Sequence, residues 1–254
     1  IAITDHLRYF PGSADRDFVV LDGIECNDND YRPGRVCHIT GVGFSAPPPD
    51  IPRNTPPQQI IDALRSCGAW VTLAHPAWSL MHHQDALDLR GYDALEVYST
   101  ISDTYAGRGD SAGYADILAS AGRPVLLTCV DDSHFHDRDA LRAFVMVSAP
   151  ALGREPILEG LRQGRFYASN GPLISAIRMG GGVVEVECPQ PMARIRFMSN
   201  AQWSARRVVE GPVRSAQYTL MPQESWIRIE CEDECGRVAY SPFLPMDVCR
   251  RESR

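Results

Sequence analysis

Imidazole and carboxylate side chains recur in this sequence directly beside short apolar runs. The first run, "IAITDH", ends in Thr-Asp-His, and later runs border the stretches "GIEC", "CHIT", "LAHP" and "CVDDSH". A single His after a strand is more often a hydrogen-bonded loop residue than a metal ligand. Several such residues at strand ends favour a shared metal site, and this mixture of ligand types suits Zn, Mn or Fe. The residues concerned are His6, Glu25, His38, His75, Asp132 and His134.

The stretch "DDSHFHD" at 131–137 divides its side chains between two faces. In an extended chain Asp132 and His134 lie two residues apart on one face, so both can enter one metal cluster. His136 would share that face if the strand continued, but the following "DR" favours a turn. We therefore expect His136 to face solvent, with contact to metal or substrate as the alternative. Asp131 points the other way and is expected to brace a loop or a ligand His.

The elements that must position these residues follow an alternating pattern up to about residue 172. Apolar runs rich in β-branched residues predict strands at 1–4, 18–24, 37–44, 70–74, 94–98, 124–130 and 143–147. Helical spacing predicts helices at 56–68, 111–122 and 155–164. The Pro-rich stretch 46–57 and the His82–His83 pair are expected in loops. Strands that alternate with helices indicate an α/β architecture with a mostly parallel sheet or barrel, whose active site lies at the carboxyl ends of the strands.

The pattern of apolar and polar residues changes after "GRFYASNGP" at 164–172. Short alternating segments such as "VVEVEC", "ARIRFMS" and "SWIRIEC" are separated by turn-forming stretches, without a clear helical pattern. These segments predict a small antiparallel, sandwich-like β domain at 173–254, after an α/β domain at 1–172.

Composition excludes several classes of function. The net charge of −7 disfavours a broad electrostatic grip on duplex nucleic acid. All 25 basic residues are Arg, so chemistry that needs a lysine amine is excluded, including Schiff bases and the P-loop. The longest nearly continuous apolar stretch, at 143–152, is well short of the ~18 residues of a membrane span. Eight scattered Cys predict free thiols in a reducing compartment, and hence a cytoplasmic protein.

Five motifs, in this order, resemble those of the PHP family, named for polymerase and histidinol phosphatase domains. They are "ITDH" at 3–6, "GIE" at 23–25, "CHITGVG" at 37–43, "AHP" at 74–76 and "DDSH" at 131–134. The stretches "GRFYASNGP" and "GRVAYSPFLP" resemble the two-domain branch that includes carbaryl-hydrolase-like metallohydrolases. The resemblance covers residues 1–172 and implies a distorted (β/α)7 TIM-like barrel that holds about two to three divalent ions of Mn, Fe or Zn.

The resemblance also implies roles for the individual residues. Glu25 would bridge two ions, with His38 and His75 completing one of those sites and Asp132 serving the other. His6 and His134 would help to hold a third ion, and Asp5 would be a ligand or the partner of one. The family pattern opens with a His-x-His strand, whereas this chain begins at the second motif. We therefore expect a first strand upstream of Ile1, without which the chain would bind fewer ions and be inactive.

Three functions remain open at this point. The leading hypothesis is metal-assisted hydrolysis of a small-molecule phosphoester, with Asp132 or His134 moving the proton and Arg108 clamping the phosphate. The second hypothesis is hydrolysis of a carbamate, amide or ester bond by the same kind of site. The third is a non-catalytic barrel that binds metal in a structural or regulatory role.

Overall fold

The computed structural model describes residues 1–27, 31–32, 35–201 and 203–250. A first sheet has five strands in the order β3-β4-β5-β6-β7. Their bounds are β3 Gly23–Cys26, β4 Ile39–Val42, β5 Trp70–Leu73, β6 Ala94–Ser99 and β7 Leu126–Val130. β5, β6 and β7 run parallel, whereas β4 is antiparallel to both of its neighbours, β3 and β5. The first sheet is therefore mixed rather than mostly parallel.

This mixed order brings the start of one strand to the same edge as the ends of the others. Cys26, at the end of β3, lies opposite Ile39, at the start of β4, and Ile39 in turn lies opposite Leu73, at the end of β5. His38 precedes β4, so it reaches the edge where β3, β5 and β7 end. The sequence pattern placed His38 at the beginning of its strand, and the antiparallel pairing of β4 makes that position suitable for a shared site.

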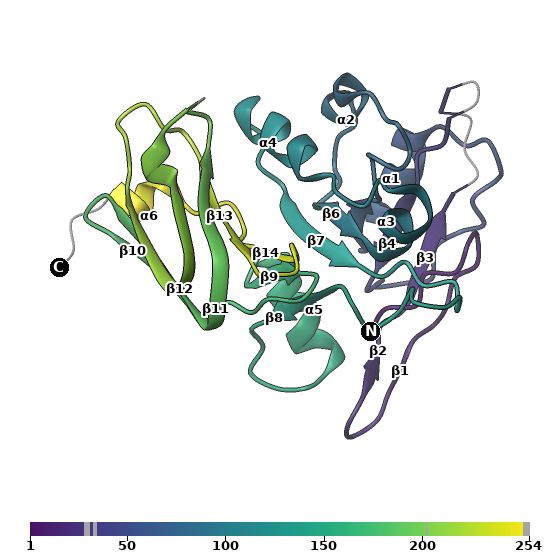
Figure 1. Cartoon of the computed structure of the whole chain (residues 1–254). Coiled ribbons are helices and arrows are strands. Elements are labelled where there is room, and N and C mark those ends of the chain that lie inside the picture. Colours follow the sequence, from purple (N-terminus) through teal and green to yellow (C-terminus); the bar gives the residue numbers. More distant parts are fainter. Residues whose placement is uncertain (28–30, 33–34, 202, 251–254) are drawn as a thin grey trace.

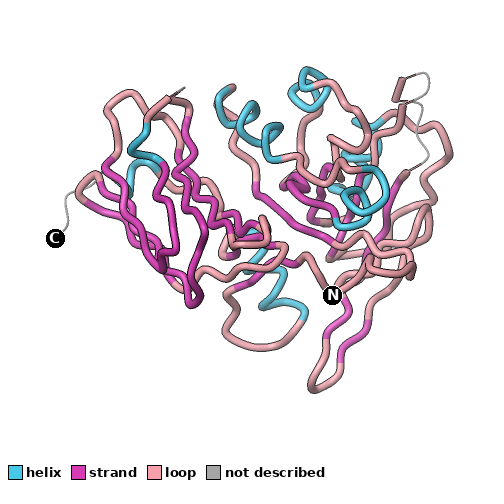
Figure 2. Tube along the Cα trace, in the orientation of Figure 1, coloured by secondary structure: helices cyan, strands magenta, loops and turns pink. Residues whose placement is uncertain are grey.

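Helices cover this sheet and connect its strands (Figures 1 and 2). They are α1 Pro57–Ser66, α2 His83–Asp88, α3 Thr100–Ala106 and α4 Ala112–Ser120. α1 buries Ile60, Ile61 and Leu64 in the core beneath the sheet. The predictions for α1 and α4 are confirmed, but α2 and α3 lie where no helix was expected. The expectation that His82 and His83 lie on an irregular loop is wrong in part, because His83 is the first residue of α2.

The N-terminal segment runs beside β3 rather than forming a regular strand. Ala2 bridges Leu21 and His6 bridges Glu25, both in parallel orientation, and Glu25 N–H donates to the carbonyl oxygen of Asp5 at 3.1 Å. β1 Ser13–Ala14 and β2 Val19–Val20 form a short antiparallel pair after it. His6 is thereby held next to Glu25 by backbone pairing.

A second sheet of seven antiparallel strands contains most of the remaining chain. Its order is β10-β11-β13-β14-β9-β8, and β12 pairs with β11. The bounds are β8 Phe144–Val147, β9 Phe166–Ser169, β10 Ala176–Gly180, β11 Val183–Ser199, β12 Val208–Thr219, β13 Ile227–Glu232 and β14 Val238–Tyr240. α5 Arg154–Arg162 links β8 to β9, the 3₁₀ turn η1 Ala205–Arg207 precedes β12, and α6 Met246–Arg250 follows β14.

The long strand β11 contributes to the hydrophobic core of the second sheet. Its register with β12 breaks between Glu187 and Met192, where Pro189 and Pro191 interrupt the ladder, so the strand bends. Val184, Ile195 and Phe197 are fully buried on its inner face. Antiparallel strands follow residue 172 as expected, although two of the expected segments, "VVEVEC" and "ARIRFMS", form this single strand.

A closed seven-stranded barrel is not confirmed. β8, expected as its last strand, pairs with β9 in the second sheet, so the described strands of the first sheet form an open sheet of five. The boundary expected at residue 172 stays a prediction, because β8 and β9 precede it and yet belong to the sheet that follows it. Figure 1 shows β8, β9 and β14 lying between the two halves of the molecule.

Two further sequence expectations can be compared with the structure. The eight Cys all lie among the described residues, none of them forms a disulfide, and Cys235 is the exposed one. Among the described residues, no helix combines the length and apolarity that crossing a membrane requires.

Candidate metal centre

Six of the predicted residues meet at one edge of the first sheet, around the buried carboxylate of Glu25. Glu25 Oε1 lies 2.7 Å from His38 Nδ1 and 3.8 Å from His75 Nε2, while Oε2 lies 3.5 Å from His6 Nε2. The two carboxylate oxygens therefore face different imidazoles. His6, Glu25 and His38 each place one ligand-type atom within 4.8 Å of the others, which is compatible with a shared cation.

Asp132 and His134 extend the cluster from the end of β7. Asp132 Oδ2 lies 3.7 Å from His75 Nε2, and Asp132 Oδ1 lies 3.9 Å from His134 Nδ1. The His134 ring lies 5.3 Å from the His6 ring, centre to centre. The cluster thus has a buried side at His38 and His75 and a more open side at His6 and His134, whose side chains are about two-fifths exposed.

Contacts behind the imidazoles orient the rings. Asn27 Nδ2 lies 2.8 Å from His6 Nδ1, and the Ser79 hydroxyl lies 3.4 Å from His75 Nδ1. In both rings Nε2 is then the nitrogen that faces Glu25. His134 Nδ1 lies 2.8 Å from the carbonyl oxygen of Asp132 and donates to it in the matching tautomer. A ring N–H that donates to a carbonyl oxygen, as in His134, is typical of ligand His residues.

Two of the cluster residues have strained backbones. His75 has a φ of 24° and Asp132 a φ of 54°, which are left-handed values that residues with a side chain rarely adopt. Each such residue costs ~1–3 kcal/mol, and such residues concentrate at functional sites.

The charges of the cluster are strongly coupled. Burial alone would raise the pKa of Glu25, but the imidazoles of His38, His6 and His75 beside it hold that pKa well below its usual value. Burial would lower the pKa of His75, yet the surrounding carboxylates, Glu25 first, raise it to about 9. Burial and the neighbouring Glu25 raise the pKa of Asp132 to about 6. Negative charge thus accumulates around these imidazoles, as a cation site requires.

The donors fit a metal ion better than they fit one another. Glu25 Oε1 and His38 Nδ1 are buried and 2.7 Å apart, yet neither has a properly directed hydrogen bond among the described residues. A buried polar atom without a partner is costly, ~1–3 kcal/mol. A divalent cation between these atoms would satisfy both, and the mixture of imidazole and carboxylate suits Zn, Mn or Fe.

The remaining predicted site residues lie outside this group. The Asp5 side chain is exposed, and the residue contacts the cluster through its carbonyl oxygen, which accepts from Glu25 N–H. His136 stacks on His134 at 6.4 Å between ring centres and is exposed. Arg108 is exposed on the turn after α3, where its backbone N–H donates to Ser102. Substrate binding by His136 and Arg108 remains a prediction.

The sequence interpretation missed Glu96 and Trp78. Glu96 lies inside β6, is 5% exposed, and its Oε2 accepts from His75 N–H at 3.0 Å. Burial raises its pKa to about 8. The Trp78 ring lies 5.4 Å from the His38 ring and 5.0 Å from the His75 ring. A lone acidic residue within the apolar strand "ALEVYS" was the available signal for Glu96.

Comparisons with known proteins add little to this geometry. No protein-family model matches the chain, and no curated protein is significantly similar to it. Among solved structures, the chain is similar to a two-domain protein from Bacteroides vulgatus ATCC 8482 that contains a predicted PHP-like metal-dependent phosphoesterase. The two are 12% identical with a TM-score of 0.46, and the match covers 96% of this chain and 85% of the other. Values this low establish neither a family nor a shared fold.

Proposed function

We propose that this chain is a metal-dependent hydrolase and, more specifically, a phosphoesterase acting on a small molecule. The observation that carries the proposal is the convergence of six ligand-type residues with Glu25 at their centre, including two buried atoms that have no hydrogen-bond partner in the described part of the chain. The five sequence motifs that resemble the PHP family point the same way. Bound divalent ions would supply an activated water and would offset the charge of the phosphate and of the leaving oxygen.

The protein's own residues have separable roles in this proposal. Glu25 Oε1, His38 and His75 would hold one ion on the buried side, and Glu25 Oε2 and His6 would hold another on the open side. Asp132 would complete the set beside His75. His134 lies at the open rim, where its Nε2 can donate a proton to the leaving group while Nδ1 stays bonded to the Asp132 carbonyl oxygen.

Elemental analysis after loading with Mn²⁺, Fe²⁺ or Zn²⁺ and desalting tests the metal centre. We expect about two ions per chain in the native protein and the joint loss of both in Glu25→Gln, because one carboxylate faces both groups of imidazoles. Glu234→Gln, at an exposed turn of the second sheet, is the matched control and should bind as the native chain does. A native chain that retains no ion after loading would refute the proposal.

A substrate panel then separates the reactions. Metal-dependent turnover of p-nitrophenyl phosphate or bis(p-nitrophenyl) phosphate that Glu25→Gln abolishes would support the phosphoesterase. Turnover restricted to an aryl carbamate or ester would replace it with the second hypothesis. Full metal occupancy without turnover of any substrate would favour a structural or regulatory metal site.

A further inference from the structure

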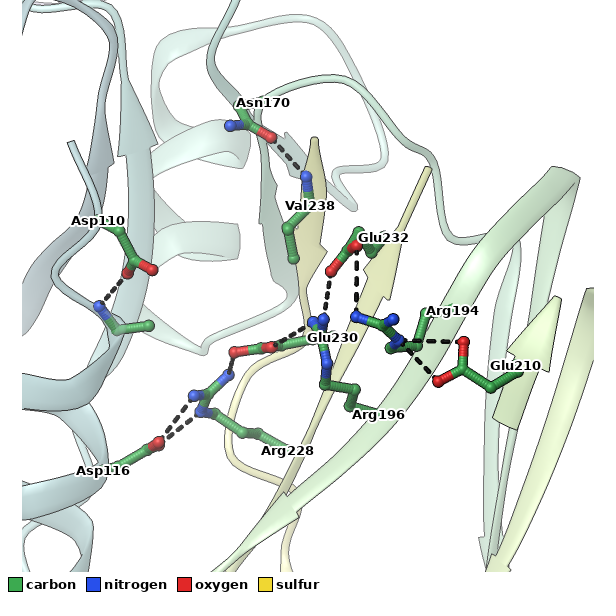
Figure 3. A network of polar contacts seen from close by, with 11 residues as sticks. Asp110, Asp116, Asn170, Arg194, Arg196, Glu210, Arg228, Glu230, Glu232 and Val238 are labelled. Atoms are coloured by element: carbon green, nitrogen blue, oxygen red, sulfur yellow. Dashed lines mark hydrogen bonds and ion pairs between the residues drawn. The ribbon is translucent and has the colours of Figure 1, made fainter. Parts of the chain in front are cut away.

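A buried arginine ties the second sheet to the helix layer of the first. Arg228 in β13 is 1% exposed, and its Nε and Nη2 donate to the two carboxylate oxygens of Asp116 in α4, at 2.6 and 2.8 Å. Its Nη1 donates to Glu230 Oε1 at 2.7 Å. Figure 3 shows this contact at the end of a series of Arg–Glu pairs that crosses the second sheet through Arg196 and Arg194.

A second contact fixes the end of the same helix. Trp226 Nε1 donates to the hydroxyl of Ser120, the last residue of α4, at 3.2 Å. α4 has nine residues, and isolated helices shorter than ~12–15 residues are marginal in water. The place of α4 therefore depends on what it is attached to.

The other end of α4 holds the segment that carries His75. Ser111, directly before the helix, is 2% exposed, and its hydroxyl accepts from Ala77 N–H at 3.1 Å. The Tyr114 hydroxyl donates to the carbonyl oxygen of Met81 at 2.6 Å. The segment 75–81 is thus attached to α4 near both of its ends. A displacement of α4 would act on the residue whose φ of 24° already needs external support.

We propose that Arg228 is a positioning residue of the metal centre, acting through Asp116, α4 and Ser111 on the segment 75–81. The second sheet then determines the position of His75. The affinity for the ion on the buried side therefore depends on the Arg228–Asp116 contact, in which none of the proposed metal ligands takes part. The expected effect on metal affinity rests on the proposed function, whereas the mechanical coupling between Arg228 and the segment 75–81 does not. Losing one partner of a buried pair leaves an uncompensated charge, so the contact is sensitive to substitution.

The test compares Arg228→Met with Arg178→Met in the full chain. Arg178 makes a similar paired contact with Glu187 in the second sheet, but this pair is about half exposed and belongs to the β10–β11 edge. Hydrogen exchange read by mass spectrometry reports the segment 75–81, and titration with Mn²⁺ reports the affinity. We expect Arg228→Met to increase exchange in 75–81 and α4, to leave β4 protected, and to weaken Mn²⁺ binding about 10-fold or more. Arg178→Met should change neither.

Ser111→Ala tests the other end of the same helix with a smaller change. It removes the acceptor of Ala77 N–H while leaving Arg228 in place, so it should reproduce the exchange increase in 75–81 without one at the Arg228 contact. It also decides the matter if Arg228→Met does not fold. Unchanged exchange in 75–81 in a folded Arg228→Met or in Ser111→Ala would overturn the inference. A native chain that binds no Mn²⁺ would refute the proposed function, while the exchange comparison would still decide the mechanical coupling.

Discussion

Replacing Glu96 should isolate the role of its hydrogen bond, because a pKa of about 8 keeps the buried carboxyl mostly neutral at pH 7. The carboxylate is 5% exposed, and its Oε2 accepts from the backbone N–H of His75 at 3.0 Å. Glu96→Ala would leave that N–H buried without its acceptor, which costs ~1–3 kcal/mol. Glu96→Gln keeps an amide oxygen in the same place, so it should cost less than ~1 kcal/mol.

The strained backbone of His75 adds a second consequence. A φ of 24° is stable only while its surroundings enforce it, and the bond to Glu96 is one of the constraints on that peptide. Glu96→Ala should therefore let His75 relax away from Glu25, and metal affinity should fall together with stability. In Glu96→Gln both properties should stay near the native values.

Urea unfolding of the metal-free protein, followed by tryptophan fluorescence, measures the stability change. With an m value of ~1–3 kcal/mol/M, a loss of ~2 kcal/mol lowers the midpoint by roughly 1 M at unchanged slope. Glu234→Ala serves as the control for an exposed glutamate. Equal losses in Glu96→Ala and Glu96→Gln would refute the reasoning, since the loss would then not depend on the acceptor oxygen. A neutral Glu96→Ala would refute it as well.

Two further predictions concern other buried contacts. Asp131 accepts from Ala143 N–H at 2.8 Å and from the Thr100 hydroxyl at 2.9 Å. Asp131→Ala should therefore release the loop 131–143, and faster hydrogen exchange in that loop would detect the change. Unchanged exchange would contradict this role. Burial and the adjacent Glu224 raise the pKa of Tyr218 to about 12, above ~10 in the unfolded chain. The stabilising contribution is then full below pH 10 and lost as the pH rises through 12, so the urea midpoint of the native chain should fall more over that range than that of Tyr218→Phe. Parallel curves would contradict the assignment.

The sequence was sufficient to locate most of the residues that cluster around Glu25 but not the sheet that carries them. Glu25, His75 and Asp132 stand at or just beyond strand ends, and alternation along short apolar runs is enough to locate such positions. His38 precedes its strand, and only the antiparallel pairing of β4 brings it to the same edge. Strand pairing is a long-range property that periodicity does not specify, so an open mixed sheet could not be distinguished from a closed barrel.

The sheet to which β8 belongs was predicted wrongly for the same reason, since strand pairing is a long-range property. Its run "AFVMV" predicts a strand correctly, but both the first sheet and β9 offer an edge to such a strand. In the structure α5 connects β8 to β9, and β9 pairs antiparallel with β8. The short helices α2 and α3 were missed for a local reason, because six or seven residues give too few turns to establish a helical period.

The acidic residues of "DDSHFHDRD" show where spacing stops being informative. Asp131 was expected to brace a loop, and its side chain does so, but Asp139 attracted no expectation. It is fully buried and accepts from the backbone N–H groups of His134 and His136, at 2.8 and 2.9 Å. One carboxylate therefore shapes the turn that presents another, Asp132, to the cluster. The proposed ligand Asp132 and the brace Asp139 have the same residue type within eight positions, and only the direction of each side chain relative to the folded loop separates them. A metal site of this kind is specified as much by its backbone anchors as by its donors, and the anchors leave no spacing signature.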